Sequence, residues 1–121
     1  MPHYADVAAG YIALWNERDV EKRATMLASR WTEDAVYVDP LSKAKGLAEM
    51  DALVASVQGK FPRDFKFALR GSPNGFGEYL RFSWSLGPAR QSASIEGTDF
   101  ATLERSKIKS VTGFLDKIPT S

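Results

Sequence analysis

The hydrophobic period of this chain changes from helical to strand-like near Pro62. Before that point apolar residues recur at helical spacing in three segments, and after it they alternate with polar residues, as in half-buried strands. Three helices that surround one short strand and precede four long strands, without regular strand–helix–strand alternation, are typical of an α+β domain in which one face of an antiparallel sheet packs on helices. The expected helices cover about residues 3 to 17, a stretch that begins after Asp19, and residues 47 to about 58; the expected strands cover residues 35 to 39, 65 to 70, 79 to 86, 93 to 103 and 108 to about 117.

In the second helix, which Asp19 is suited to cap, we expect one stripe of small and apolar side chains to be buried and the charged side chains to face water. The expected buried stripe is Val20, Ala24, Leu27 and Ala28, and the expected water-facing residues are Glu21, Lys22 and Arg23. Glycine, proline, asparagine and serine predict loops or turns at residues 41 to 46, 72 to 75, 87 to 88 and 105 to 107.

The composition excludes several classes of site. The 121 residues include no cysteine, which rules out disulfides and thiolate metal sites, and 16 basic against 15 acidic residues leave no electrostatic footprint for nucleic acid. The single histidine, His3, lies near the end of the chain, so acid–base chemistry would fall to carboxylates and tyrosines. The length predicts one domain over residues 1–121, and the lack of an apolar leader or a membrane-length apolar run predicts a cytoplasmic protein.

The stretch from Trp31 to Pro40 contains a predicted strand that ends on a carboxylate. Ala35, Tyr37 and Asp39 alternate onto one face, and Pro40 stops the ladder because it has no N–H to donate. An aspartate among aromatic side chains at a strand end can act as a shielded general base. An aspartate before a proline is also a common turn former, because its side chain bonds nearby backbone N–H groups. Both interpretations of Asp39 stay open.

Two further polar side chains fall on apolar faces. Asp99 lies in the middle of an apolar row on its strand, where a carboxylate is costly unless it is hydrogen-bonded, neutralised or paired, for instance with Arg81 or Arg90 across the hairpin. Tyr11 lies on the buried stripe of the first helix, where a tyrosine usually satisfies its hydroxyl within the core. The aromatic residues expected in the core or in the wall of a pocket are Trp15, Trp31, Tyr37, Phe82 and Trp84.

The order of elements and several motifs resemble the nuclear transport factor 2-like superfamily, specifically its ketosteroid isomerase and SnoaL-like polyketide cyclase branches. The motifs, which span nearly the whole chain, are Tyr11-Ile-Ala-Leu-Trp-Asn16, Trp31-Thr-Glu-Asp34, Tyr37-Val-Asp-Pro40, Arg81-Phe-Ser-Trp84, Gly97-Thr-Asp-Phe100 and Ser110-Val-Thr-Gly-Phe114. The resemblance implies a cone-shaped, curved antiparallel sheet wrapped around the three helices, with an apolar pocket at its open end. It also implies a homodimer, and the outer face of the sheet is the expected interface because Phe100, Phe114 and Tyr79 alternate away from the pocket.

In the isomerase branch, a base aspartate works with a tyrosine and a protonated aspartate that hold the enolate oxygen. By position in the motifs, Asp39 matches the base, Tyr11 the tyrosine and Asp99 the neutral acid. The resemblance therefore implies a small pocket enzyme, an isomerase or cyclase, that moves a proton next to the carbonyl of an apolar ketone without a metal or other cofactor. Two alternatives stay open: a non-catalytic binding module for an apolar small molecule, and an epoxide hydrolase of the limonene type, which would need Arg81 inside the pocket between two aspartates.

Overall fold

The computed structural model of the protein describes residues 3–88 and 93–119. Within these ranges the helices are α1 (Tyr4–Asn16), α2 (Val20–Arg30) and α3 (Gly46–Gly59), close to the predicted positions. The strands are β1 (Trp31–Val38), β2 (Lys43–Lys45), β3 (Phe65–Phe76), β4 (Tyr79–Pro88), β5 (Ile95–Glu104) and β6 (Lys107–Lys117). None of the described helices combines the length and the apolar character needed to cross a bilayer.

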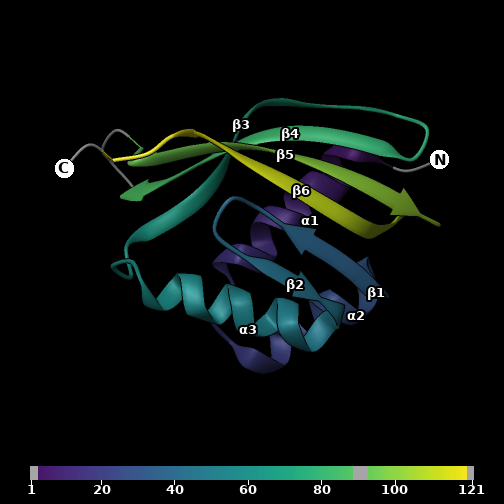
Figure 1. The fold of residues 1–121 in the computed structure, drawn as a ribbon, viewed down its shortest axis with the longest axis horizontal. Coiled ribbons are helices and arrows are strands. Elements are labelled where there is room, and N and C mark those ends of the chain that lie inside the picture. The colour runs from purple at the N-terminus through teal and green to yellow at the C-terminus, as the bar shows by residue number, and fades with distance from the viewer. Residues whose placement is uncertain (1–2, 89–92, 120–121) are drawn as a thin grey trace.

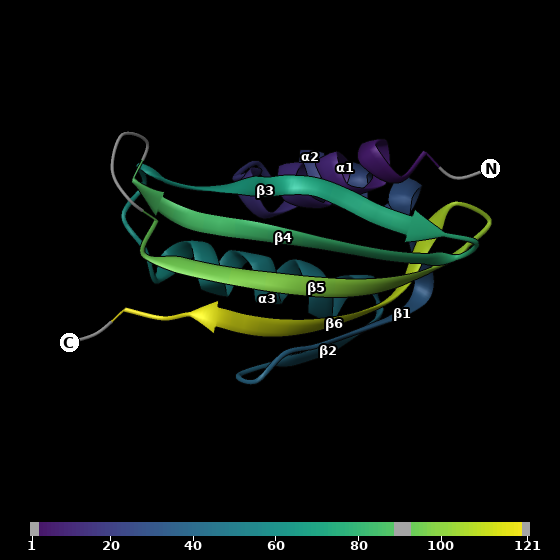
Figure 2. The same cartoon turned by 90° about the horizontal axis from the view of Figure 1, so that it is seen from above.

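The strands form one open, curved sheet in the order β2-β1-β6-β5-β4-β3, and the helices lie on one face of it (Figure 1). Figure 2 shows the long strands β3 to β6 side by side, with the helices behind them. This arrangement confirms the predicted α+β class with N-terminal helices. The sheet is mixed, however, because β1 pairs with β6 in parallel while the other pairs are antiparallel. After α3 the chain enters the sheet at the edge strand β3 and passes through β4 and β5 to β6. There β6 lies beside β1 and runs in the same direction.

Two segments expected as loops or turns are part of the sheet. Residues 43–45 of the expected loop pair with β1 as the short edge strand β2. Residues 72–75 were predicted as a turn from their proline, asparagine and glycine, but β3 continues through them to Phe76. The pairing of β3 with β4 shifts in register between Arg70 and Asn74, and this irregularity accommodates the proline. The hairpin turns at Gly77, whose φ of +53° favours glycine. The turn predicted at residues 87–88 falls at the end of β4, next to residues outside the described ranges.

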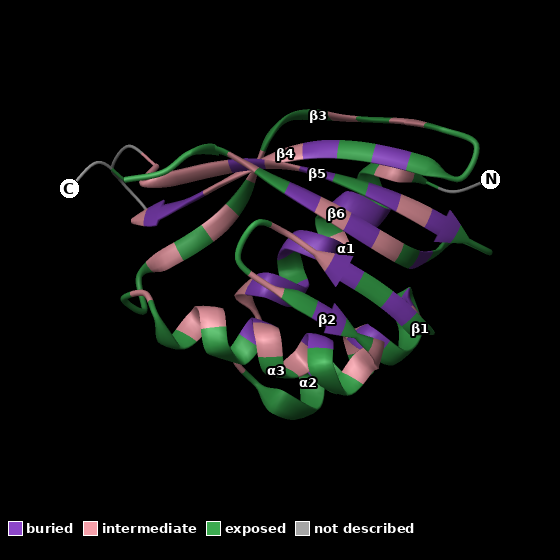
Figure 3. Ribbon diagram, in the orientation of Figure 1, coloured by how far each residue is buried: buried purple, intermediate pink, exposed green. Residues whose placement is uncertain are grey.

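The core lies between α1, α3 and the inner face of the sheet. α1 buries six residues, and buried positions alternate along β4 and β5 as predicted (Figure 3). The largest fully buried apolar side chains are Leu14, Leu27, Val54, Leu80, Ile108 and Val111. Burying a side chain of this kind stabilises the fold by about 1.5–3 kcal/mol, and these contacts pack the helices against the strands that carry the polar groups of the site.

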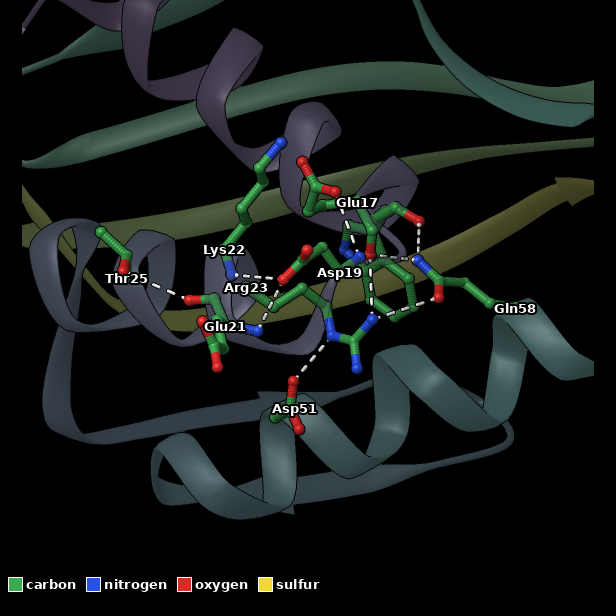
Figure 4. A network of polar contacts seen from close by, with 9 residues as sticks. Glu17, Asp19, Glu21, Lys22, Arg23, Thr25, Asp51 and Gln58 are labelled. Carbon is green, nitrogen blue, oxygen red and sulfur yellow. Dashed lines mark hydrogen bonds and ion pairs between the residues drawn. The ribbon is translucent and has the colours of Figure 1, made fainter.

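The predicted burial of α2 is wrong in detail. Asp19 does cap the helix, since its side chain accepts hydrogen bonds from the N–H groups of Glu21 and Lys22. Arg23, expected to face water, is instead 3% exposed. Of the expected buried stripe only Leu27 is buried, because Val20 is 62% exposed and Ala24 and Ala28 are exposed as well. The Arg23 guanidinium bonds Asp51 of α3 at 2.7 Å, the Glu17 carbonyl and the Gln58 side chain (Figure 4). A buried guanidinium is tolerated because these acceptors replace water.

Candidate active site

A cavity of about 270 Å³ lies between α1, the C-terminal end of α3 and the inner face of the sheet. Aromatic and aliphatic side chains form most of its wall, among them Ile12, Trp15, Phe67, Trp84, Leu86, Ile95 and Leu115. The three predicted catalytic residues, Tyr11, Asp39 and Asp99, all line it. Tyr37 lines it as well, whereas Trp31 and Phe82 do not. These two side chains lie in the core against the Tyr11 ring, with ring centroids 6.0 and 4.9 Å from it, and so hold Tyr11 in place.

Asp39 follows the last residue of β1 and is half-buried, with hydrogen-bond donors around it. Its Oδ1 accepts from the backbone N–H groups of Leu41 and Ser42, both at 2.8 Å. Its Oδ2 accepts from the Tyr37 hydroxyl at 2.6 Å, since positions two apart on a strand share a face. The two interpretations of Asp39, as a turn former and as a pocket residue, therefore apply to different oxygens of one carboxyl. Oδ1 stabilises the turn through Leu41 and Ser42, and Oδ2 is bonded to Tyr37.

Asp99 is 2% exposed and sits at the inner end of the cavity. The Tyr11 hydroxyl lies 2.5 Å from its Oδ2, and the Trp84 indole N–H donates to its Oδ1 at 3.1 Å. Tyr11 comes from α1, 88 residues away along the chain. The Tyr11 hydroxyl thus bonds to Asp99 directly, which the sequence did not indicate.

Gly113 on β6 separates the two carboxyl groups. It pairs with Asp99 across the strands, and a Cβ placed on it would lie 2.9 Å from Asp99 Oδ1 and 3.3 Å from the Asp39 Cβ. Asp39, at the end of β1, and Asp99, on β5, consequently approach the same small volume from the two sides of β6. Only a residue without a side chain leaves this space free.

The electrostatics of the site follow from burial and from the closeness of the two acids. Burial raises the pKa of the Asp99 carboxyl from its ordinary 3.8 to about 6; the bonds from Tyr11 and Trp84 oppose this, while the nearby charges of Asp39 and Asp116 add to it. Burial, followed by the charge of Asp99, likewise holds the pKa of Tyr11 well above its usual range. The pKa of Tyr37 is also raised, first by burial and then by its bond to Asp39. Both tyrosines are therefore neutral hydrogen-bond donors.

Trp84 contacts Asp99 because β5 carries a glycine opposite it. Gly97 pairs with Trp84, and a Cβ on Gly97 would overlap the indole ring. The ring therefore lies over the β5 backbone and directs its N–H at Asp99, two residues farther along the same face. From the sequence, Trp84 was predicted only to lie in the core or in the wall of a pocket; the available signal was a glycine two positions before a buried acid and opposite a tryptophan.

Two arginines, Arg81 and Arg90, were predicted as possible partners of Asp99, and the structure describes only Arg81. The Arg81 side chain is exposed and lies on the strand face opposite to Phe82 and the core. It therefore neither pairs with Asp99 nor enters the cavity between the two aspartates. Arg90 lies outside the described residues. The arginine that an epoxide hydrolase of the limonene type requires is thus not supplied by Arg81.

Comparison with known proteins identifies relatives by structure. No family model and no curated protein matches the chain. Among solved structures, a candidate isomerase of the SnoaL-like family from Agrobacterium tumefaciens is 37% identical, with a TM-score of 0.88 over 93% of this chain and 97% of that one. A candidate ketosteroid isomerase from Kribbella flavida is 18% identical, with a TM-score of 0.70 over 98% of this chain and 81% of that one. A candidate SnoaL-like polyketide cyclase from Jannaschia is 14% identical, with a TM-score of 0.71 over 96% and 89% of the two chains.

The last two similarities, at low identity, support the fold alone. The first extends over nearly the full length of both chains at an identity that establishes kinship. The resemblance drawn from the motifs is thereby confirmed: the chain shares its fold with ketosteroid isomerase-like and polyketide cyclase-like structures, and it belongs to the SnoaL-like family.

Proposed function

We propose that the protein moves a proton next to the carbonyl group of an apolar ketone, as an isomerase or an aldol cyclase does. The observation that carries this proposal is the pair of carboxyl groups with unlike surroundings that face one apolar cavity. Asp39 accepts hydrogen bonds from three donors at the end of β1, whereas burial favours the protonated form of Asp99. Carboxyl groups that differ in this way divide the roles of base and acid.

Asp39 acts as the base. Its Oδ1 is occupied by two backbone N–H groups, and its Oδ2, held by one bond from Tyr37, keeps a lone pair for a proton of the ligand. These bonds fix the orientation of the carboxylate before the ligand arrives. A positioned general base contributes typically about 10²–10⁴-fold to a rate.

Asp99 and Tyr11 stabilise the enolate oxygen as a unit. When Asp99 is ionised, the single hydroxyl hydrogen of Tyr11 is used on Asp99 and cannot reach a ligand. When Asp99 is protonated, it can donate to the Tyr11 oxygen, which frees the Tyr11 hydrogen for the ligand. Activity should therefore require protonated Asp99 and decline as pH rises through about 6, where the raised pKa of Asp99 lies.

Exchange of the protons next to a ketone for deuterium tests the proposal without knowledge of the natural substrate. The probe is 2-tetralone, a bicyclic ketone, followed by NMR in deuterated buffer. Asp39→Asn should slow the protein-dependent exchange by about 10²–10⁴-fold, because an amide cannot take the proton. Asp34→Asn is the matched control, since Asp34 is on the same strand and exposed; it should leave exchange unchanged.

The same assay separates the alternative functions. Exchange that is no faster with the wild-type protein than with buffer, although 2-tetralone binds, would favour a binding module. Protein-dependent exchange, measured as the excess over buffer at each pH, that rises rather than falls as pH passes about 6 would mean that Asp99, not Asp39, takes the proton. Hydrolysis of a terpenoid epoxide by the protein would favour the hydrolase and contradict the roles of Asp39 as base and Asp99 as neutral acid.

A further inference from the structure

We propose that the ligand of this cavity is amphiphilic: a keto group at the Asp99 end, an apolar body, and an anionic group at the outer end beside Lys60. The orientation of the keto end rests on the proposed function. The class of ligand follows from the distribution of charge and apolar surface along the cavity. A carboxylate and a phosphate would both suit the outer position.

The charges that line the cavity are arranged from inside to outside. Among the described residues on its wall, the charged ones are Asp39, Asp99 and Lys60. Asp99 is buried, Asp39 is half-buried and Lys60, just after α3, is exposed. An anionic ligand group inside the cavity would face two acids in an apolar space, which is strongly unfavourable. At the mouth, the same group would meet the lysine ammonium and water.

The outer part of the cavity wall is apolar as well. Leu41 and Ile118 both line the cavity and are 83% and 60% exposed, and Phe61 beside Lys60 is half-buried. Leu41 follows β1, Phe61 follows α3 and Ile118 follows β6, so three separate segments bring apolar side chains to one rim. In Figure 1 the C-terminal ends of α3 and β6 point toward the same side of the molecule.

The small volume of the cavity implies that a longer ligand would reach the rim formed by Leu41, Phe61 and Ile118. Its volume of about 270 Å³ is slightly below the usual range of ligand pockets, about 300–1,000 Å³. A ligand larger than the cavity would keep its outer methylenes on Leu41, Phe61 and Ile118 and carry its last group to Lys60. Contact with the outer methylenes of such a ligand would account for the exposure of these large apolar side chains.

Two matched pairs of keto compounds test the class of ligand by calorimetric titration. The long pair is 2-undecanone and 10-oxoundecanoate, which have the same chain and a methyl ketone at the inner end. The short pair is 2-hexanone and 5-oxohexanoate, whose carboxylate lies five carbons closer to the ketone and so remains farther inside the cavity when the ketone is at Asp99. We expect the long keto acid to bind about 2–5-fold more tightly than the long ketone, as for an exposed ion pair. We expect the short keto acid to bind at least about tenfold more weakly than the short ketone.

Lys60→Gln should remove the preference for the long keto acid, so that the long keto acid and 2-undecanone bind the variant with equal affinity. Raising the salt concentration should reduce the preference in the wild-type protein, because exposed charges are screened. Lys22→Gln is the matched control: Lys22 is an exposed lysine of α2 that does not line this cavity, and its replacement should keep the preference.

The outcomes decide the proposal independently of catalysis. A long keto acid that binds no more tightly than 2-undecanone, or a preference that survives Lys60→Gln, would overturn it. These measurements concern binding only, so they can fail while Asp39→Asn still abolishes exchange. Conversely, a preference that depends on Lys60 would stand even if no exchange were found.

Discussion

Replacing Asp99 by asparagine removes a buried ionisable group and nearly preserves its shape. In the wild-type protein, burial raises the pKa of the Asp99 carboxyl from its ordinary 3.8 to about 6. The amide can keep both neighbours, because its oxygen can accept from the Trp84 indole and its NH₂ can donate to the Tyr11 oxygen. We therefore expect the variant to fold and to lose the pH dependence of stability that Asp99 contributes.

The sign and size of this dependence follow from the two pKa values. The folded protein prefers protonated Asp99, so the stabilisation is fully present below about pH 3.8 and is lost as pH rises through about 6. The gap between these values, at about 1.4 kcal/mol per pH unit, corresponds to about 3 kcal/mol of unfolding free energy. Between pH 4 and pH 8 the wild-type protein should lose about 2 kcal/mol relative to Asp99→Asn. For a domain of this size, that is about 8 °C in melting temperature.

Urea unfolding of both proteins from pH 4 to pH 8 measures the effect, and the difference between them cancels the other ionisable groups. Carbon-13 NMR of the Asp99 carboxyl gives its titration directly. A difference in unfolding free energy that stays constant with pH would refute the reasoning, as would an ionised Asp99 signal at pH 5. A wild-type advantage that grows with pH would mean that a cation faces Asp99.

Two further predictions concern packing and assembly. Gly97→Ala should destabilise the fold by about 1–3 kcal/mol in urea unfolding, because the new Cβ overlaps Trp84. Gly59→Ala is the control, and it should be neutral or slightly stabilising because the space around Gly59 is open. Equal effects of the two changes would contradict the packing described for Trp84. We also expect a homodimer through the outer face of the sheet, where the exposed rings of Tyr79 and Phe100 stack with centroids 6.1 Å apart. Light scattering at micromolar concentration should give twice the chain mass, and Phe100→Asp should halve it; a monomeric wild-type protein would sink this prediction.

Local patterns of the sequence were sufficient for the elements and for the candidate acids. The change of period near Pro62 separates helices from strands, because each kind of element exposes one face at its own spacing. The same alternation placed Asp99 among buried residues of β5 and Asp39 at the end of β1. The family motifs added Tyr11, which helical spacing had placed only on a buried stripe. These inferences succeeded because they depend on residues a few positions apart.

Interactions between distant segments decided the rest. The parallel pairing of β1 with β6 depends on how the chain returns through the sheet, and no local pattern encodes this return. Arg23 is buried because Asp51 and Gln58 of α3 happen to supply acceptors, which outweigh the tendency of a charged side chain to face water. Proline and asparagine at residues 72–75 favour a turn locally, yet pairing with β4 holds them in a strand.

The chemistry of the site is likewise a tertiary property. Tyr11 and Asp99 belong to α1 and β5, and Trp84 reaches Asp99 only because Gly97 is its cross-strand partner. The sequence predicted an acid on an apolar face, but it did not indicate whether Asp99 faces a cation or neutral donors. The kind of neighbour decides the direction in which the pKa of Asp99 shifts, because a neighbouring cation lowers the pKa and burial among neutral donors raises it. The tertiary structure brings α1 and the strands together around Gly113, and it thereby gives Asp99 the neutral donors Tyr11 and Trp84.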